Sequence, residues 1–436
     1  MKILSYDETG ALTLDGHNLD ALAHEHGTPT YVYSAPRIVE NYRRIKKAIT
    51  AKMPDQKHIF CYAVKANSHI AVLKLLAREN AGADVVSKGE LMRCLKAGIP
   101  ADKIVFSGVG KTENEIAYAI EKGILQINAE SLTELERIDK VASRLNKRAR
   151  VGLRINPDVA GGEHDKTSTG RKDDKFGIGY DYGIESYLNA KRFTHIDITG
   201  MSVHIGSQIV DIAPFDRAYQ KIAAFVKNLE KAGITLKTID LGGGMGINYT
   251  DEKPLDMQAY AETVARHFSE FNATLVYEPG RYITGDAGIL LAKVEYVKET
   301  PSGRTFVILD TGMGELLRPA LYGVTHPVLP CKKHDLDDRP AAIYDVVGPI
   351  CESSDIFSRN VSGQIMHQGD TVAITVSGAY GMSMASKYNT RALPLEIMTS
   401  PRHINVISPR QTLEDILSHE TIPEWIENNS SDDERT

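Results

Sequence analysis

The stretch HIFCYAVKAN, residues 58–67, runs from apolar residues into a lysine and an asparagine at its end. A short run rich in apolar and aromatic residues is typical of a buried strand. Seven similar runs follow, and helix-like segments separate them, a pattern typical of parallel strands joined by crossover helices. The eight runs are HIFCYAVKA (58–66), ADVVS (83–87), KIVFSG (103–108), ILQINAE (124–130), RVGLRIN (150–156), ITGMSVHIG (198–206), TIDLGGG (238–244) and TLVYEPG (274–280).

Eight parallel strands close a (β/α)8 barrel, so the sequence predicts an α/β fold built on a TIM-like barrel. Capping-box pairs directly follow three of the runs and mark the helix starts. An open doubly wound sheet would also alternate strands and helices, but no GxGxxG stands at an early strand-to-helix turn. The barrel is therefore the favoured interpretation. The capping-box pairs are Ser87 with Glu90, Thr112 with Glu115, and Ser131 with Glu134.

After Arg281 the chain continues as strand-like runs without amphipathic helices between them, which predicts a second, mainly antiparallel β domain. We expect the N-terminal residues to add an edge strand to it. The predicted boundaries are 1–35 for an N-terminal segment associated with the β domain, 36–281 for the barrel, 282–426 for the β domain, and 427–436 for a disordered acidic tail. The strand-like runs are 289–298, 304–312, 341–349 and 371–379.

The composition of the 436-residue chain is that of an average soluble protein, with 42% hydrophobic and 25% charged residues. A net charge of −6 leaves no basic footprint for nucleic acid, so small molecules are the expected partners. Four cysteines without CxxC spacing indicate neither a disulfide framework nor a metal site. The start of the chain lacks an apolar signal core, and no apolar run reaches the roughly 20 residues that span a membrane. We therefore expect a cytoplasmic protein.

Active sites of such barrels lie at the C-terminal ends of the strands, where several polar residues stand. Lys65 ends an apolar run, and a desolvated lysine with a lowered pKa forms Schiff bases readily; the alternative is a salt bridge at a strand tip. The glycines 242–244 and the sequence Glu-Pro-Gly-Arg at 278–281 follow the last two strands, where barrel enzymes commonly hold phosphate.

Two further strand ends carry titratable residues. Glu278 is a carboxylate expected to be buried, so it needs a cation, either a pyridinium nitrogen or a barrel arginine such as Arg154. His204 is either a core histidine bonded to backbone or a ring laid against a flat cofactor, and its spacing alone leaves both alternatives open.

Eight motifs in order make the chain resemble the diaminopimelate decarboxylases, a family of pyridoxal-5′-phosphate (PLP) enzymes related through the barrel to alanine racemase. The resemblance runs from about Thr28 to Tyr388. The motifs are YAVKAN (62–67), ADVVSKGE (83–90), HIGSQ (204–208), DLGGG (240–244), EPGR (278–281), RPALYG (318–323), GPICESSDIF (348–357) and GAYG (378–381).

The resemblance implies that Lys65 forms the Schiff base with PLP, that His204 stacks on the pyridine ring, and that Glu278 pairs with the ring nitrogen. Glu278 then keeps the ring protonated, and the ring withdraws electrons from a carbanion. The remaining implied cofactor contacts, most of them to the phosphate, are Ser207, Gly243, Gly244, Gly280, Arg281 and Tyr380.

For the substrate, the resemblance implies that Arg281, Arg318 and Tyr322 hold the distal carboxylate, with Tyr380 nearby, and that Glu352 holds the distal ammonium. Cys351 resembles the catalytic cysteine that enters from the neighbouring subunit and protonates the carbanion, which implies a homodimer with shared active sites. The loop at 160–175 resembles the family's mobile active-site loop.

The implied reaction is the decarboxylation of meso-2,6-diaminopimelate to L-lysine and carbon dioxide, the last step of lysine biosynthesis. Alternatives are decarboxylation of ornithine, arginine or another amino acid on the same fold, an amino-acid racemase, and a non-catalytic PLP-binding protein of the single-barrel kind. HIGSQ and CESSDIF argue against the first, and the second domain argues against the last.

Overall fold

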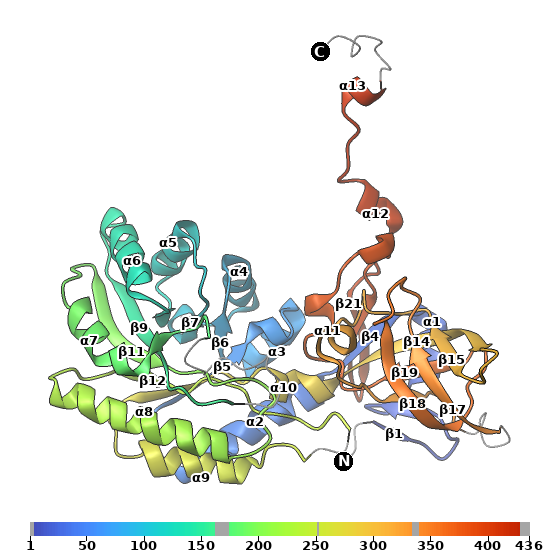
Figure 1. The fold of residues 1–436 in the computed structure, drawn as a ribbon, viewed down its shortest axis with the longest axis horizontal. Helices are drawn as coiled ribbons and strands as arrows, with labels where there is room; N and C mark the ends of the chain where they lie inside the picture. Colours follow the sequence, from blue (N-terminus) through green and yellow to red (C-terminus); the bar gives the residue numbers. More distant parts are fainter. Residues whose placement is uncertain (1–3, 162–173, 251–252, 334–339, 428–436) are drawn as a thin grey trace.

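The eight predicted barrel strands all form in the computed structural model, which describes residues 4–161, 174–250, 253–333 and 340–427. Strand β9 pairs with both β8 and β11, so the parallel strands close into a ring and the predicted barrel is confirmed. In Figure 1 the barrel lies to one side of a second, β-rich domain. The ring consists of β5 (His58–Ala63), β6 (Gly82–Val85), β7 (Ile104–Phe106), β8 (Gln126–Ala129), β9 (Ala149–Asn156), β11 (Ile196–Ser202), β12 (Thr238–Asp240) and β13 (Thr274–Tyr277).

Helices follow these strands around the barrel, and their starts only partly match the predicted capping boxes. Thr112 and Glu115 form the complete reciprocal box. Ser87 and Ser131 also cap their helices, but Glu90 and Glu134 each accept a hydrogen bond from the residue before the cap, at 2.8 Å in both cases. The helices are α2 (Ala35–Lys52), α3 (Ile70–Arg78), α4 (Lys88–Ala97), α5 (Glu113–Lys122), α6 (Leu132–Arg144), α7 (Tyr180–Ala190), α8 (Ala213–Lys231) and α9 (Met257–Phe268), and a short strand β10 (Ile178–Gly179) extends β9.

The barrel interior contains a layer of buried polar side chains. Gln126 accepts a hydrogen bond from Thr238 (2.5 Å) and donates one to Asn128 (2.6 Å). Gly152 and Gly200, on the neighbouring strands, leave the space for it, because a Cβ on either would come within 3.0 Å of the Gln126 amide. Two glycines therefore make room for one hydrogen-bonded amide in the barrel core.

The second domain is built on a mixed sheet in the order β18-β17-β15-β14-β4-β20-β21, in which most neighbours are antiparallel. The N-terminal strand β4 pairs antiparallel with β14 and parallel with β20. Our expectation of an edge strand is therefore wrong: β4 is fully buried inside the sheet. The strands are β4 (Thr30–Ser34), β14 (Gly288–Glu299), β15 (Thr305–Leu309), β17 (Ala341–Val347), β18 (Ile356–Gln364), β20 (Leu395–Ser400) and β21 (His403–Ser408), with β16 (Val328–Pro330) and β19 (Thr371–Ile374) paired beside β14.

Smaller elements complete the chain. Most of the predicted acidic tail, residues 428–436, lies outside the described residues, as does most of the predicted mobile loop, residues 162–173. In the part that the structure describes, no helix is both long and apolar enough to cross a membrane. The smaller elements are the three-stranded sheet β1 (Leu4–Tyr6), β2 (Leu12–Leu14) and β3 (His17–Asn18), and the helices α1 (Leu19–His26), α10 (Arg281–Thr284), α11 (Arg318–Tyr322), α12 (Leu413–Leu417) and α13 (Glu424–Glu427).

The glycine at position 200 offers a test of the barrel core. We expect Gly200→Ala to lower the free energy of unfolding by roughly 1–3 kcal/mol, because the added methyl group overlaps the Gln126 and Thr238 side chains. Gly110→Ala is the control, since a Cβ there meets nothing within 4 Å, and it should change stability by less than about 0.5 kcal/mol. Urea denaturation measures both, and equal stabilities would contradict the packing described here.

Candidate active site

The predicted lysine stands just beyond the C-terminal end of β5, in a single turn of 3-10 helix (Val64–Ala66). Its Nζ lies 2.8 Å from Oδ2 of Asp84, a fully buried carboxylate at the end of β6. The charges of Glu278 and Tyr380 also act on this amine, and the charge of the amine acts on His204. The structure thus gathers the four predicted residues Lys65, His204, Glu278 and Tyr380 at one end of the barrel.

The predicted lowering of the lysine pKa is wrong for this arrangement. Burial does lower the pKa of Lys65, but the carboxylates of Asp84 and Glu278 outweigh burial and raise the pKa above its ordinary value. The amine is consequently a stable ammonium at neutral pH. Before it can act as a nucleophile its proton must leave, and the nearest acceptor is Asp84.

Glu278 follows β13 and is 7% exposed. Burial and the neighbouring carboxylates of Asp240 and Asp84 raise its pKa well above the usual range. Its Oε1 accepts a hydrogen bond of 3.4 Å from Ser107. The alternative partner Arg154 is excluded, since that guanidinium pairs with Glu130 at 2.9 Å. Glu278 is therefore a buried acid without an arginine, as a site for a protonated ring nitrogen requires.

His204 follows β11, and its ring is neutral. Burial and the positive charges of Arg154 and Lys65 hold its pKa well below the usual value. The backbone N–H of Gly243 donates to Nδ1 (3.2 Å), so the single ring proton sits on Nε2. A neutral, oriented ring suits contact with a flat cofactor.

The glycine loops after β12 and β13 pack too closely for side chains. A Cβ on Gly243 would come within 3.0 Å of the Glu278 carbonyl, one on Gly244 would meet the carbonyl of Gly206, and one on Gly280 would meet Ala63 at 2.9 Å. Gly242 and Gly244 also adopt positive φ values of 69° and 97°. These positions therefore require glycine, and glycine-rich turns of this kind are typical of the cradles that bind phosphate.

Arg281 begins α10 beside this cradle and is 7% exposed. Its Nη2 donates to Ser207 Oγ (3.0 Å) and its Nη1 to the hydroxyl of Tyr249 (2.5 Å). The Nε of Arg281 has no hydrogen-bond partner among the described residues. A buried donor without an acceptor fits an anion at this place.

The second predicted arginine is close to the first. Arg318, at the start of α11 and 4% exposed, lies over the rings of Tyr249 (5.1 Å), Tyr322 (5.4 Å) and Tyr380 (5.8 Å). Arg281 lies over the Tyr380 ring at 4.8 Å. Burial lowers the pKa of Arg318, and the charge of Arg281 acts in the same direction. Two buried guanidiniums that share aromatic rings form a strong site for a carboxylate.

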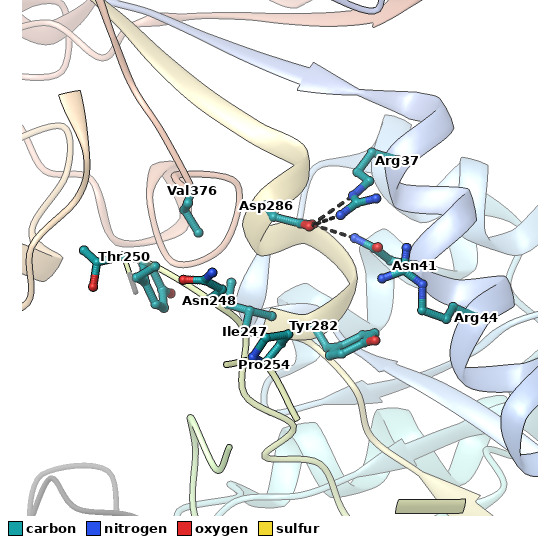
Figure 2. Close-up of a pocket in the computed structure, with 11 residues that line it drawn as sticks. Arg37, Asn41, Arg44, Ile247, Asn248, Thr250, Pro254, Tyr282, Asp286 and Val376 are labelled. Atoms are coloured by element: carbon teal, nitrogen blue, oxygen red, sulfur yellow. Dashed lines mark hydrogen bonds and ion pairs between the residues drawn. The ribbon is translucent and has the colours of Figure 1, made fainter. Parts of the chain in front are cut away.

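A cavity of about 390 Å³ lies between α2, the turn after α10, and residues 247–250 with Pro254 (Figure 2). Figure 2 shows Asp286 pointing from that turn toward α2, where it accepts hydrogen bonds from Arg37 (2.5 Å) and Asn41 (2.7 Å). Asn41 also donates to the carbonyl of Ile283. These hydrogen bonds tie α10, which begins with Arg281, and the turn after it to α2.

The predicted residues Cys351 and Glu352 are placed differently from the rest. Both are exposed on the turn between β17 and β18. Glu352 accepts a hydrogen bond of 2.7 Å from the hydroxyl of Tyr388, which is exposed as well. Asp355 shapes this turn by accepting from the backbone of Ile350 (2.8 Å). Within one chain, these two residues therefore stand on the surface and not with the buried group around Lys65.

Several residues of the site escaped the sequence analysis. Asp84 and Asp240 are fully buried at the ends of β6 and β12, and Tyr249 joins the two arginines. Each acidic residue stands inside a quoted motif, ADVVS or DLGGG, so a charge embedded in an apolar strand was an available signal. Tyr249 had no such signal, because it follows a loop without a strand pattern.

The donor set fits PLP. An amine, a buried acid, a neutral imidazole, a glycine cradle and a buried arginine with an unpartnered N–H lie together. They match the aldehyde, the ring nitrogen, the ring face and the phosphate of that cofactor.

Comparisons with known proteins agree. A profile of the family described as "Pyridoxal-dependent decarboxylase, pyridoxal binding domain" matches residues 36–285. The diaminopimelate decarboxylase of Zymomonas mobilis is 43% identical over 421 residues, covering 96% of this chain and 99% of that protein. The Vibrio cholerae enzyme of the same name is 39% identical, with 97% and 99% covered.

Solved structures of the same kind superpose closely. Diaminopimelate decarboxylase from Helicobacter pylori, complexed with L-lysine, has a TM-score of 0.87 at 39% identity, with 92% of this chain and 98% of that chain covered. The enzyme from M. jannaschii, in co-complex with L-lysine, has a TM-score of 0.91 at 36% identity, with 97% and 98% covered. With similarity of this extent over nearly the whole length, the chain belongs to the diaminopimelate decarboxylase family of pyridoxal-dependent decarboxylases.

Proposed function

We propose that the protein is a PLP-dependent carboxy-lyase that converts meso-diaminopimelate to L-lysine and carbon dioxide, the last step of lysine biosynthesis. The observation that carries the substrate assignment is the pair of buried guanidiniums, Arg281 and Arg318, sharing the rings of Tyr249 and Tyr380. Diaminopimelate has a second amino-acid head whose carboxylate suits such a pair. Ornithine and lysine end in an amine, which two arginines would repel.

Different residues of the chain would bind different parts of the cofactor. Lys65 would attach PLP through its ε-amine, and Glu278 would face the ring nitrogen. His204, fixed by Gly243, would cover one ring face. The cradle of Gly243, Gly244 and Gly280, with Ser207, Arg281 and Tyr380, would hold the phosphate. When bound, PLP supplies an electron sink for the bond that breaks as carbon dioxide leaves.

The acids that surround Lys65 would accept and hold the protons of the site. Asp84 accepts a hydrogen bond from the Lys65 ammonium and is placed to take its proton. Asp240 raises the pKa of Glu278, so a proton would be available where Glu278 would face the ring nitrogen. Both acids are buried, so water does not screen these effects.

The substrate's distal head would be held at both of its charges. Arg281, Arg318 and Tyr322 would bind its carboxylate, with Tyr380 between cofactor and substrate. Glu352 would bind its ammonium. A polar group buried without its partner is costly, so a substrate lacking the carboxylate would leave Arg318 unmatched and would be rejected.

We further propose that the working form is a cytoplasmic homodimer with shared active sites. The support is the exposure of Cys351 and Glu352, which places both where a second chain can receive them. Cys351 would donate a proton to the substrate carbon that loses carbon dioxide in the partner's site. In such a dimer, the barrel of each chain would face the β domain of the other chain. The predicted domains are the N-terminal segment 1–35 associated with the β domain, the barrel 36–281 and the β domain 282–426.

Removing the carboxylate beside Lys65 should shift the pH at which cofactor attaches. Because Asp84 raises the Lys65 pKa, Asp84→Asn lowers it, and the free amine becomes available at lower pH. The rate at which apo-protein gains the visible absorption of bound PLP, measured against pH, should therefore rise at lower pH than in the wild type. Asp102→Asn, on the surface, should leave the profile unchanged. A profile displaced to higher pH would contradict this role.

The substrate assignment predicts release of carbon dioxide from meso-diaminopimelate and not from ornithine or lysine. Arg318→Ala should raise KM for diaminopimelate by about 10- to 150-fold, since a charge-assisted hydrogen bond is worth roughly 1.5–3 kcal/mol. Racemisation without carbon dioxide would favour a racemase, and an unchanged KM would remove Arg318 from the clamp.

The shared site predicts complementation between two inactive variants. Lys65→Ala and Cys351→Ala should each be nearly inactive as homodimers. A mixture that exchanges subunits contains heterodimers with one doubly altered site and one intact site, so activity should return partly. Subunit exchange is followed with a tagged chain. A mixture that exchanges and stays inactive would mean that each site is built within one chain.

A further inference from the structure

The turn that carries Cys351 and Glu352 contains a buried carboxylate that has no role in the proposed function. Asp355 ends this turn, directly before β18, and is 3% exposed. Its Oδ2 accepts a hydrogen bond from the backbone N–H of Ile350 (2.8 Å), and its Oδ1 accepts one from the backbone N–H of Met313 (2.6 Å). The first hydrogen bond lies within the turn and the second leaves it. Asp355 therefore joins the turn to a segment that is distant in the sequence.

Two glycines leave the space that this carboxylate occupies. A Cβ on Gly312 or on Gly348 would come within 3.0 Å of an Asp355 oxygen. Burial raises the pKa of Asp355 to about 6, although its two backbone hydrogen bonds favour the charged form and oppose this shift. At mildly alkaline pH the group is therefore ionised, and both of its oxygens accept hydrogen bonds. Charge-assisted hydrogen bonds of this kind are stronger than neutral ones.

The segment around Met313 is fixed to the core of the β domain. Oε2 of Glu315, which is itself buried, accepts a hydrogen bond from the backbone N–H of Gly312 (2.8 Å). The backbone carbonyl of Glu315 accepts a hydrogen bond from the hydroxyl of Tyr31 (2.7 Å). Tyr31 is fully buried on β4, inside the second sheet. This segment is therefore a firm anchor for the hydrogen bond from Met313 to the turn.

The other contacts of the turn are weaker or less directed. Glu352 and Tyr388 are both exposed, so water competes for the hydrogen bond between them. The hydroxyl of Ser354 lies 3.9 Å from a methionine sulfur, which is a weak acceptor. Ile350 buries its side chain, but apolar packing is non-directional. Asp355 thus provides the strong, directed link between the turn and the β domain.

We infer that Asp355 is a positioning residue for the proton donor: by holding the backbone of Ile350 and Met313, it sets where Cys351 stands in the active site of the partner chain. This inference rests on the proposed function for the shared site. Asp355 of one chain then serves the site built around Lys65 of the other chain, without contact with the substrate. A displacement of roughly 1 Å at a reacting group can slow a reaction about 100-fold, so the position of this thiol matters.

Hydrogen exchange tests the two hydrogen bonds without any assay of activity. Asp355→Asn keeps the size of the side chain but replaces one acceptor oxygen with an amide donor. Whichever of the Ile350 and Met313 N–H groups faces the new amide should exchange about 10-fold faster or more. Asp345→Asn is the matched control, because Asp345 is a carboxylate of the same hairpin, 3% exposed, that accepts the N–H of Asn360 (2.8 Å). It should leave exchange at Ile350 and Met313 unchanged.

Complementation shows on which active site Asp355 acts. Asp355→Asn should lower kcat by about 10- to 100-fold and leave the cofactor absorption unchanged. Mixed with Lys65→Ala, it forms heterodimers in which the intact lysine meets an intact Cys351 turn, so each heterodimer should regain about half of the wild-type turnover. Mixed with Cys351→Ala, it should regain none, because both lesions then lie on the same turn and every site receives one of them.

A second variant covers the case in which Asp355→Asn folds poorly. Gly348→Ala should push the same carboxylate aside and give the same pattern of complementation. Failure of Lys65→Ala to rescue either variant, while it does rescue Cys351→Ala, would overturn the inference. If Lys65→Ala rescues none of the three, the proposed shared site is wrong. Hydrogen exchange then decides whether Asp355 holds the turn, and unchanged exchange in Asp355→Asn would overturn that role.

Discussion

The site depends on an excess of buried acid over base at one end of the barrel. Asp84, Asp240 and Glu278 are buried together, and Lys65 is the cation among them. Carboxylates removed from water cannot all ionise next to one another, so protons are retained. Burial raises the pKa of Asp240 to about 6, and burial with the neighbouring carboxylates raises the pKa of Glu278 well above its usual range. A protonated pyridine ring is the kind of group that relieves this excess of acid.

The same acids connect the chemistry to the barrel core. Asn128 donates to Asp240 Oδ2 and to Ser107 Oγ, both at 3.1 Å, and Ser107 in turn donates to Glu278. Asn128 accepts from Gln126, the amide for which Gly152 and Gly200 leave space. A column of directed hydrogen bonds therefore runs from the middle of the barrel to the acid at its mouth. Packing in the core sets the orientation of Glu278, which a surface loop could not do as firmly.

The sequence predicted those parts of the fold that depend on local patterns. Apolar runs located the eight barrel strands, and a serine or threonine located three helix starts. The place of β4 inside the second sheet was not predictable, since pairing with β14 and β20 joins residues hundreds of positions apart. The same limit applied to the site. The motif residues of the site could be predicted from the sequence. The raised pKa of Lys65 could not, because it depends on Asp84, which comes close to Lys65 only in the folded barrel.

The two ends of the site solve the problem of buried charge in opposite ways. Around Lys65 the acids exceed the bases, so the unliganded site retains protons that a cofactor can use. Around Arg318 the bases exceed the acids, and an arginine gives up no proton, so aromatic faces and a ligand carboxylate must stabilise its charge. A molecule that carries an amino-acid head at each end matches both halves at once. Because Arg281 and Arg318 share the Tyr380 ring, we expect the spacing between the two halves to select the length of the substrate.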